Sequence, residues 1–129
     1  MKHNPAFVRL VEEARREVQE CRVDTVKQYL EEGVSFYLVD VREDHEVIPG
    51  IVPGAIHLSK GILERDIETT IPDKLAKIIL YCGGGYRSVL AAANAQKMGY
   101  KHVWSMEGGI KAWKEAGYSL TEKSVGTST

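Results

Sequence analysis

The sequence lacks the features that mark exported, membrane-inserted or disulfide-rich proteins. No apolar run approaches the roughly 20 residues that a membrane helix needs. Residues 1–20 carry charges throughout and contain no apolar signal-peptide core. Cysteine is rare: only Cys21 and Cys82 occur, and two cysteines in a chain without an export signal are expected to stay reduced. We therefore expect a cytoplasmic protein whose two thiols are not paired.

A large net charge of either sign is also lacking. The formal net charge is −1, so no broad electrostatic attraction to nucleic acid or to an anionic membrane is expected. The four histidines lie far apart and make no metal-ligand spacing with the cysteines, which predicts neither a metal site nor a cofactor. Apolar residues make up 43% and charged residues 27% of the 129 residues, the usual balance of one globular domain.

Short apolar segments alternate with helical patterns over most of the chain. Segments typical of strands are 35–41, 55–59, 75–82 and 102–106, and segments typical of helices are 25–32, 61–71, 88–98 and 110–116. Asp24 or Thr25 can cap the first of these helices, and Gly33 ends it. The alternation predicts an α/β fold with about five strands in a parallel sheet and helices on both faces.

The two ends of the chain are expected to lie outside this alternation. Apolar residues recur at helical spacing from Phe7 to Cys21, with charges on the other face, which predicts an amphipathic packing helix over 5–21. Residues 1–21 are thus an N-terminal extension of a domain at 22–120. Residues 121–129 show no apolar pattern and are predicted to be a flexible tail.

The stretch "CGGGYRS" at residues 82–88 combines features that activate a thiol. Thiolates are stabilised by helix N-termini and by nearby cations, and here a helix opens beside Arg87. Three glycines remove every Cβ from the turn, so that backbone N–H groups can point inward and form an anion-binding nest. Tyr86 could wall or gate the pocket. A buried structural cysteine in a tight glycine turn is the alternative, but the combination favours a nucleophile at Cys82.

Four blocks of sequence occur in an order that resembles the single-domain rhodanese (sulfurtransferase) family. They are "DVRE" (40–43), "PGAIHL" (53–58), "CGGGYRS" (82–88) and "GGIKAW" (108–113), within a resemblance that runs from about residue 22 to 120. The resemblance implies a rhodanese-like fold. It also implies that Cys82 accepts a sulfane sulfur as a persulfide and passes it to a thiol or another nucleophilic acceptor.

The resemblance further assigns roles around Cys82. The backbone N–H groups of the loop would cradle the persulfide and its substrate, and the residues concerned are Gly83, Gly84, Gly85, Tyr86, Arg87 and Ser88. Asp40 and Arg42 would brace the site from behind, although an ion pair near the surface explains that pair almost as well. Gly108, Gly109 and Trp113 match the family as determinants of the fold.

Loop length and loop charge separate the alternatives. Phosphatases that share this fold have Cys-x5-Arg, whereas Cys82 and Arg87 are spaced Cys-x4-Arg, so a cysteine phosphatase or arsenate reductase is the less favoured enzyme. Asp44, His45 and Glu46 could serve such an enzyme as general acid by residue type alone. A non-catalytic binding module of the same fold is the other alternative. Because "GGGY" carries no charge, a low-molecular-weight or protein persulfide competes with thiosulfate as the expected donor, and a thiol or a protein is the expected acceptor.

Overall fold

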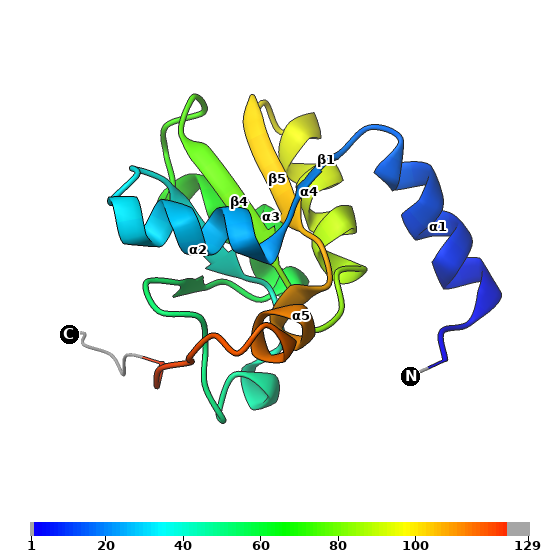
Figure 1. The fold of residues 1–129 in the computed structure, drawn as a ribbon. Coiled ribbons are helices and arrows are strands. Elements are labelled where there is room, and N and C mark those ends of the chain that lie inside the picture. Colours follow the sequence, from blue (N-terminus) through cyan, green and yellow to red (C-terminus); the bar gives the residue numbers. More distant parts are fainter. Residues whose placement is uncertain (1, 124–129) are drawn as a thin grey trace.

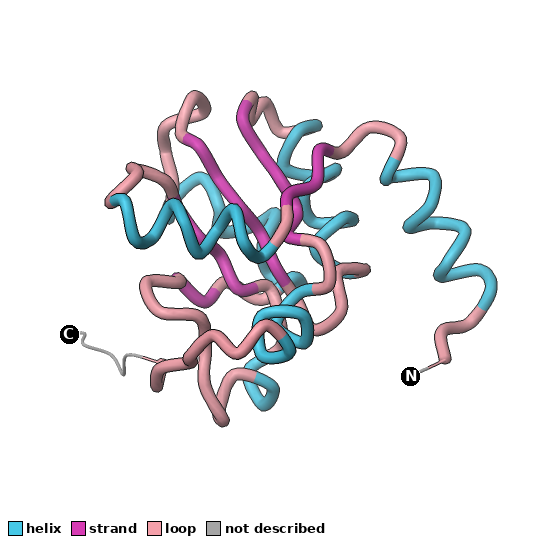
Figure 2. Tube along the Cα trace, viewed as in Figure 1, coloured by secondary structure: helices cyan, strands magenta, loops and turns pink. Residues whose placement is uncertain are grey.

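A five-stranded parallel sheet forms the centre of the computed structural model, which describes residues 2–123 (Figure 2). The strands are β1 (Gln19–Cys21), β2 (Tyr37–Asp40), β3 (Ile56–His57), β4 (Lys77–Tyr81) and β5 (His102–Met106). Their order is β1-β5-β4-β2-β3, and every neighbouring pair is parallel. The predicted α/β class and its parallel sheet are confirmed.

Helices cover both faces of the sheet (Figure 1). They are α1 (Pro5–Arg15), α2 (Val23–Glu32), α3 (Lys60–Thr70), α4 (Arg87–Lys97) and α5 (Gly109–Glu115), with a short 3-10 helix η1 at Asp44–Glu46. The helices α2 and α5 lie in front of the sheet in this view, and α3 and α4 lie behind it. The helix α1 packs on α4 rather than on the sheet itself. No helix within residues 2–123 is long and apolar enough to cross a bilayer.

The central strand β4 supplies both halves of the hydrophobic core. Successive side chains of a strand point to opposite faces of the sheet. Ile78 and Leu80 therefore pack with α3 and α4, while Ile79 and Tyr81 pack with Val26 of α2 and Trp113 of α5. Burial on both faces explains why this strand reads in the sequence as a continuous apolar run.

The predicted helix over 5–21 is wrong in its second half. Helix α1 ends at Arg15, and residues 19–21 form β1, the edge strand that pairs with β5. In this pairing Cys21 lies opposite Met106. Three residues are too few to show a strand period in the sequence, so pairing with a distant segment decides their conformation. The fifth strand of the sheet thus comes from a segment whose pattern indicated a helix.

The structure also corrects the predicted N-cap of the helix at 25–32 and the start of the predicted C-terminal tail. The N-cap of α2 is Arg22, whereas Asp24 lies inside the first turn, where its carboxylate accepts a hydrogen bond from the Tyr118 hydroxyl at 2.7 Å. Thr121, assigned to the tail, makes an isolated antiparallel bridge with Ile51. Glu122 and Lys123 are exposed, and residues 124–129 of the predicted tail lie outside the described residues.

A buried tyrosine hydroxyl joins β4 to the loop before β3. The Tyr81 oxygen accepts a hydrogen bond from the Val52 amide at 2.9 Å, and both residues are fully buried. We expect Tyr81→Phe to lower the free energy of unfolding by about 1–3 kcal/mol, because the Val52 amide loses its partner in the core. Urea denaturation would measure the loss. Tyr37→Phe, on the exposed end of β2, is the matched control, and an equal effect of both substitutions would contradict the prediction.

Candidate active site

The loop that carries Cys82 lies at the carboxyl end of β4 and leads directly into α4. Parallel sheets bind ligands at this edge. Gly85 turns the chain with a φ of +93°, and a Cβ there would lie 2.9 Å from the Gly108 nitrogen. A residue with a side chain is therefore excluded at position 85 on both conformational and steric grounds.

The first turn of α5 fixes the carbonyl groups of this loop. The Ile110 amide donates to the Cys82 carbonyl at 2.9 Å, and the Lys111 amide donates to the Gly83 carbonyl at 3.1 Å. Gly109 permits this contact, because a Cβ on its backbone, at a φ of +57°, would lie 2.4 Å from the Cys82 carbonyl oxygen. With its carbonyls turned toward α5, the loop turns amide groups toward the sulfur.

Two of those amides reach the Cys82 sulfur. The Gly85 amide donates to Sγ at 3.1 Å, and the Ser88 amide, in the first turn of α4, donates at 3.4 Å. The Cys82 side chain is 1% exposed. Hydrogen bonds from amides at a helix N-terminus favour the charged form of a buried thiol, so this arrangement can hold negative charge on sulfur.

Two buried hydroxyl groups, those of Ser88 and Ser105, form a hydrogen-bonded pair next to the Cys82 sulfur. The Cys82 thiol donates to the Ser88 hydroxyl oxygen at 3.5 Å, and the Ser88 and Ser105 hydroxyls are hydrogen-bonded at 2.7 Å. Ser88 and Ser105 are both fully buried. If the thiol loses its proton, the two hydroxyls can turn so that Ser88 donates to the sulfur. Sequence reasoning missed Ser105, although a small polar residue in the apolar strand "HVWSM" was the available signal.

Arg87 does not lie free over the loop but forms a two-point ion pair with Glu46 of η1. Its Nη1 lies 2.6 Å from Oε1 of Glu46, and its Nη2 lies 2.9 Å from Oε2. The hydrogen bonds from Arg87 lower the pKa of Glu46 from 4.5 to about 2. Glu46 is therefore ionised at neutral pH and cannot act as the general acid that its residue type allowed.

Asp40 and Arg42 form a buried ion pair at the end of β2, so the alternative of a surface pair is wrong. Asp40 is fully buried and Arg42 is 6% exposed. The Arg42 guanidinium contacts both carboxylate oxygens of Asp40 at 2.8–3.1 Å and also donates to the carbonyls of Glu46 at 2.9 Å and Gly50 at 2.8 Å. Arg42 thereby ties the segment that carries Glu46 to the sheet.

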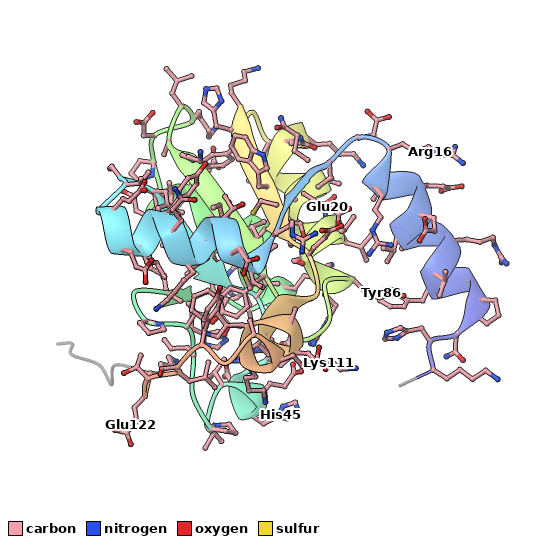
Figure 3. The ribbon with its side chains drawn as sticks, viewed as in Figure 1. Arg16, Glu20, His45, Tyr86, Lys111 and Glu122 are labelled. Carbon is pink, nitrogen blue, oxygen red and sulfur yellow. The ribbon has the colours of Figure 1, made fainter. Side chains whose placement is uncertain are left out.

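The side chain of Tyr86 points from the loop toward α1 (Figure 3). It stacks on Phe7 with ring centroids 5.9 Å apart, lies 4.3 Å from the His3 ring, and has the Arg15 guanidinium 5.1 Å from its centroid. The N-terminal helix and the active-site loop are therefore in direct contact through one aromatic side chain.

The second cysteine has a different environment. Cys21 and Cys82 are both free thiols. Burial raises the pKa of Cys21 to about 11, so Cys21 is a weak nucleophile at neutral pH. Among residues 2–123, the His, Cys, Asp and Glu side chains make no cluster able to hold a metal ion.

A match to a sequence family agrees with this geometry. Residues 22–116 match the model of the family described as "Rhodanese-like domain". The chain belongs to the rhodanese-like family. Several curated relatives carry sulfurtransferase names, and two of them illustrate the likeness. The putative sulfurtransferase YtwF of Bacillus subtilis is 35% identical over 98 residues, which are 76% of this chain and 92% of that protein.

The second of these relatives and a solved structure extend the likeness. A sulfurtransferase of Allochromatium vinosum is 30% identical over 103 residues, which cover 80% of this chain and 94% of that protein. A solved structure from Rhodopseudomonas palustris is described as a protein of unknown function and possible tyrosine phosphatase. It matches this chain with a TM-score of 0.84 at 29% identity, and the match covers 94% of this chain and 98% of that protein's chain. At the level of the family, the two curated relatives support a sulfurtransferase-type enzyme.

The hydrogen-bonded hydroxyls of Ser88 and Ser105 in this rhodanese-like domain yield a testable prediction. We expect Ser88→Ala to slow alkylation of Cys82 by iodoacetamide at neutral pH by roughly tenfold, because a thiolate loses a hydrogen-bond donor. Ser105→Ala should have a smaller effect in the same direction. The alkylation rate is measured by intact mass, with exposed Ser119→Ala as the control. Unchanged rates in both variants would contradict the prediction.

The Arg87–Glu46 pair predicts a dependence of stability on pH. The pKa of Glu46 is lower in the folded protein than its ordinary value of 4.5, so the pair stabilises the fold fully above about pH 5. This contribution is lost as the pH falls from 4.5 toward 2. Thermal melting of wild type and Glu46→Gln at pH 7 and at pH 2.5 should therefore show a difference at pH 7 that shrinks at pH 2.5. A constant difference would be inconsistent with the pair.

Proposed function

We propose that the protein transfers a sulfane sulfur through a persulfide on Cys82. In the first step the Cys82 thiolate attacks the outer sulfur of the donor, and a new S–S bond forms on Cys82. The S–S bond of the donor breaks, and the donor leaves with the electron pair, as a thiolate from a persulfide or as sulfite from thiosulfate. In the second step a thiolate or another nucleophile attacks the outer sulfur of the Cys82 persulfide and restores the Cys82 thiolate.

The observation that carries the proposal is the pair of amide hydrogen bonds from Gly85 and Ser88 to the Cys82 sulfur. Both steps begin or end with the Cys82 thiolate, and the persulfide between them is also an anion. We further propose that the backbone amides of Gly83, Gly84, Tyr86 and Arg87 hold the outer sulfur and the substrate, while the Tyr86 side chain packs on Phe7 of α1. Asp40 and Arg42 support this arrangement from behind through Glu46.

The donor and the acceptor are proposed by chemical class. A small sulfur donor, either thiosulfate or a persulfide, loads Cys82, and a thiol or a protein accepts the sulfur. Such exchange needs reduced thiols, which supports the cytoplasmic location that we propose. No nucleic acid or membrane partner is part of the proposal.

A phosphatase is the second candidate, since the solved structure from Rhodopseudomonas palustris is described as a possible tyrosine phosphatase. A cysteine phosphatase needs a neutral acid for its leaving group. Glu46 is held ionised by Arg87, and the side chain of Asp44 is 95% exposed. The short Cys-x4-Arg loop adds to this argument, so sulfur transfer is preferred.

Sulfur loading tests the proposal directly. We expect intact wild-type protein to gain the mass of one sulfur atom after incubation with thiosulfate or with glutathione persulfide. Cyanide and thiol reductants should reverse the gain. Cys82→Ser should show no gain, and Cys21→Ser, which keeps the proposed nucleophile, should load as wild type does.

Other results would redirect the assignment. No loading from either donor would reject the sulfurtransferase and leave the non-catalytic binding module as the better reading. Hydrolysis of an aryl phosphate that depends on Cys82, without sulfur loading, would favour the phosphatase.

A further inference from the structure

The loop at residues 82–88 has one cationic side chain, and that side chain is already engaged by a carboxylate. Both terminal nitrogens of Arg87 are hydrogen-bonded to the two oxygens of Glu46, at 2.6 and 2.9 Å. Recognition of an oxyanion by arginine uses the same planar fork of N–H groups. An incoming anion must therefore compete with Glu46 for Arg87.

The ion pair lies close to the reactive sulfur. A Cβ built on Gly83 would lie 3.2 Å from Nη2 of Arg87, so the guanidinium covers the loop directly after Cys82. The hydrogen bonds that Arg87 donates to Glu46 raise its pKa most, and the proximity of Cys82 and of the Glu43 carboxylate raises it further. A substrate that approaches Cys82 thus meets Arg87 together with the negative charges of Glu46 and Glu43.

The carboxylate of Glu46 is held in place from several directions. Its Oε1 accepts a hydrogen bond from the Glu43 amide at 2.8 Å, which closes a capping box around η1. The Glu46 carbonyl accepts a hydrogen bond from the buried Arg42 guanidinium at 2.9 Å. These contacts fix the backbone and side chain of Glu46 together, so displacement of the carboxylate by an anion would break a set of hydrogen bonds.

We propose that Glu46 determines donor specificity, because it cancels the charge of Arg87 and disfavours compact dianions, which bring both negative charges to the Cys82 loop. This inference rests on the proposed sulfur transfer and names its donor class. The favoured donors are persulfides of thiols, small or carried on a protein, which bring only the one negative charge of the transferable sulfur to the loop; their other charges, such as the carboxylates of glutathione, lie away from that sulfur. Thiosulfate brings two charges and needs an available cation, so it is the disfavoured donor.

The test compares two donors in three variants. Glu46→Gln removes the charge and keeps an oxygen that can accept from Arg87, whereas Glu46→Asp keeps the charge and shortens the side chain. Asp44→Asn removes the same charge from the same 3-10 helix at a side chain that is 95% exposed. For each protein, kcat and KM are measured with thiosulfate and with glutathione persulfide at low and high ionic strength.

We expect wild type to use glutathione persulfide more efficiently than thiosulfate. Glu46→Gln should raise kcat/KM for thiosulfate by about tenfold, mainly through KM, and should change the value for glutathione persulfide by less than about threefold. The gain should shrink at high salt, because exposed charges are screened. Glu46→Asp and Asp44→Asn should not show the gain.

A binding measurement separates this inference from the proposed function. Sulfate, an unreactive dianion, should protect Cys82 from iodoacetamide at about tenfold lower concentration in Glu46→Gln than in wild type. Absence of sulfur loading in wild type, with this sulfate effect present, would reject the sulfurtransferase but uphold the exclusion of dianions by Glu46. A parallel loss of activity with both donors, or unchanged sulfate protection, would show that Glu46 merely positions Arg87 and would overturn the inference.

Discussion

The orientation of one short stretch of backbone is the constraint on which the site depends. The first turn of α5 donates hydrogen bonds to the carbonyls of Cys82 and Gly83, and the amides of Gly85 and Ser88 consequently face the sulfur. If those carbonyls turned toward the sulfur instead, they would repel a thiolate. Gly109 is therefore as important to the chemistry as the loop glycines, since any Cβ at that position would separate α5 from the loop.

A second set of contacts connects the end of β2 in the sheet to Arg87 in the Cys82 loop. The buried Asp40 carboxylate holds Arg42, Arg42 holds the carbonyl of Glu46, and the Glu46 side chain holds Arg87. A buried charge is costly unless it is paired and hydrogen-bonded, and every member of this set has such a partner. The "DVRE" block therefore acts at a distance from Cys82 by fixing Glu46, which is a more specific role than bracing the fold.

The sequence was sufficient for the parts of the fold that have a local signal. Strands β2, β4 and β5 and the loop from Cys82 to Ser88 each carry enough adjacent residues of the right type to be recognised. The missed features are pairings between distant residues. Strand β1 has three residues and exists because β5 lies beside it, and the partners Glu46 and Arg87 are 41 residues apart in the chain. The contact of Tyr86 with Phe7 is of the same kind, since no local pattern shows which helix a half-buried aromatic residue in a loop will contact.

Two sources of anion stabilisation at this site differ in range, and the difference has a chemical consequence. Backbone amides act over a hydrogen-bond length, so Gly85 and Ser88 stabilise one sulfur atom that is already in place. A free guanidinium acts over several ångströms and would attract any anion in solution toward the loop. In this chain the amides are directed at the sulfur, while the guanidinium of Arg87 is neutralised by Glu46. Under the proposed sulfur transfer, such a site is better suited to hold a persulfide once it has formed than to collect free anions, and the proposed donor must gain its affinity from contacts beyond the transferred sulfur.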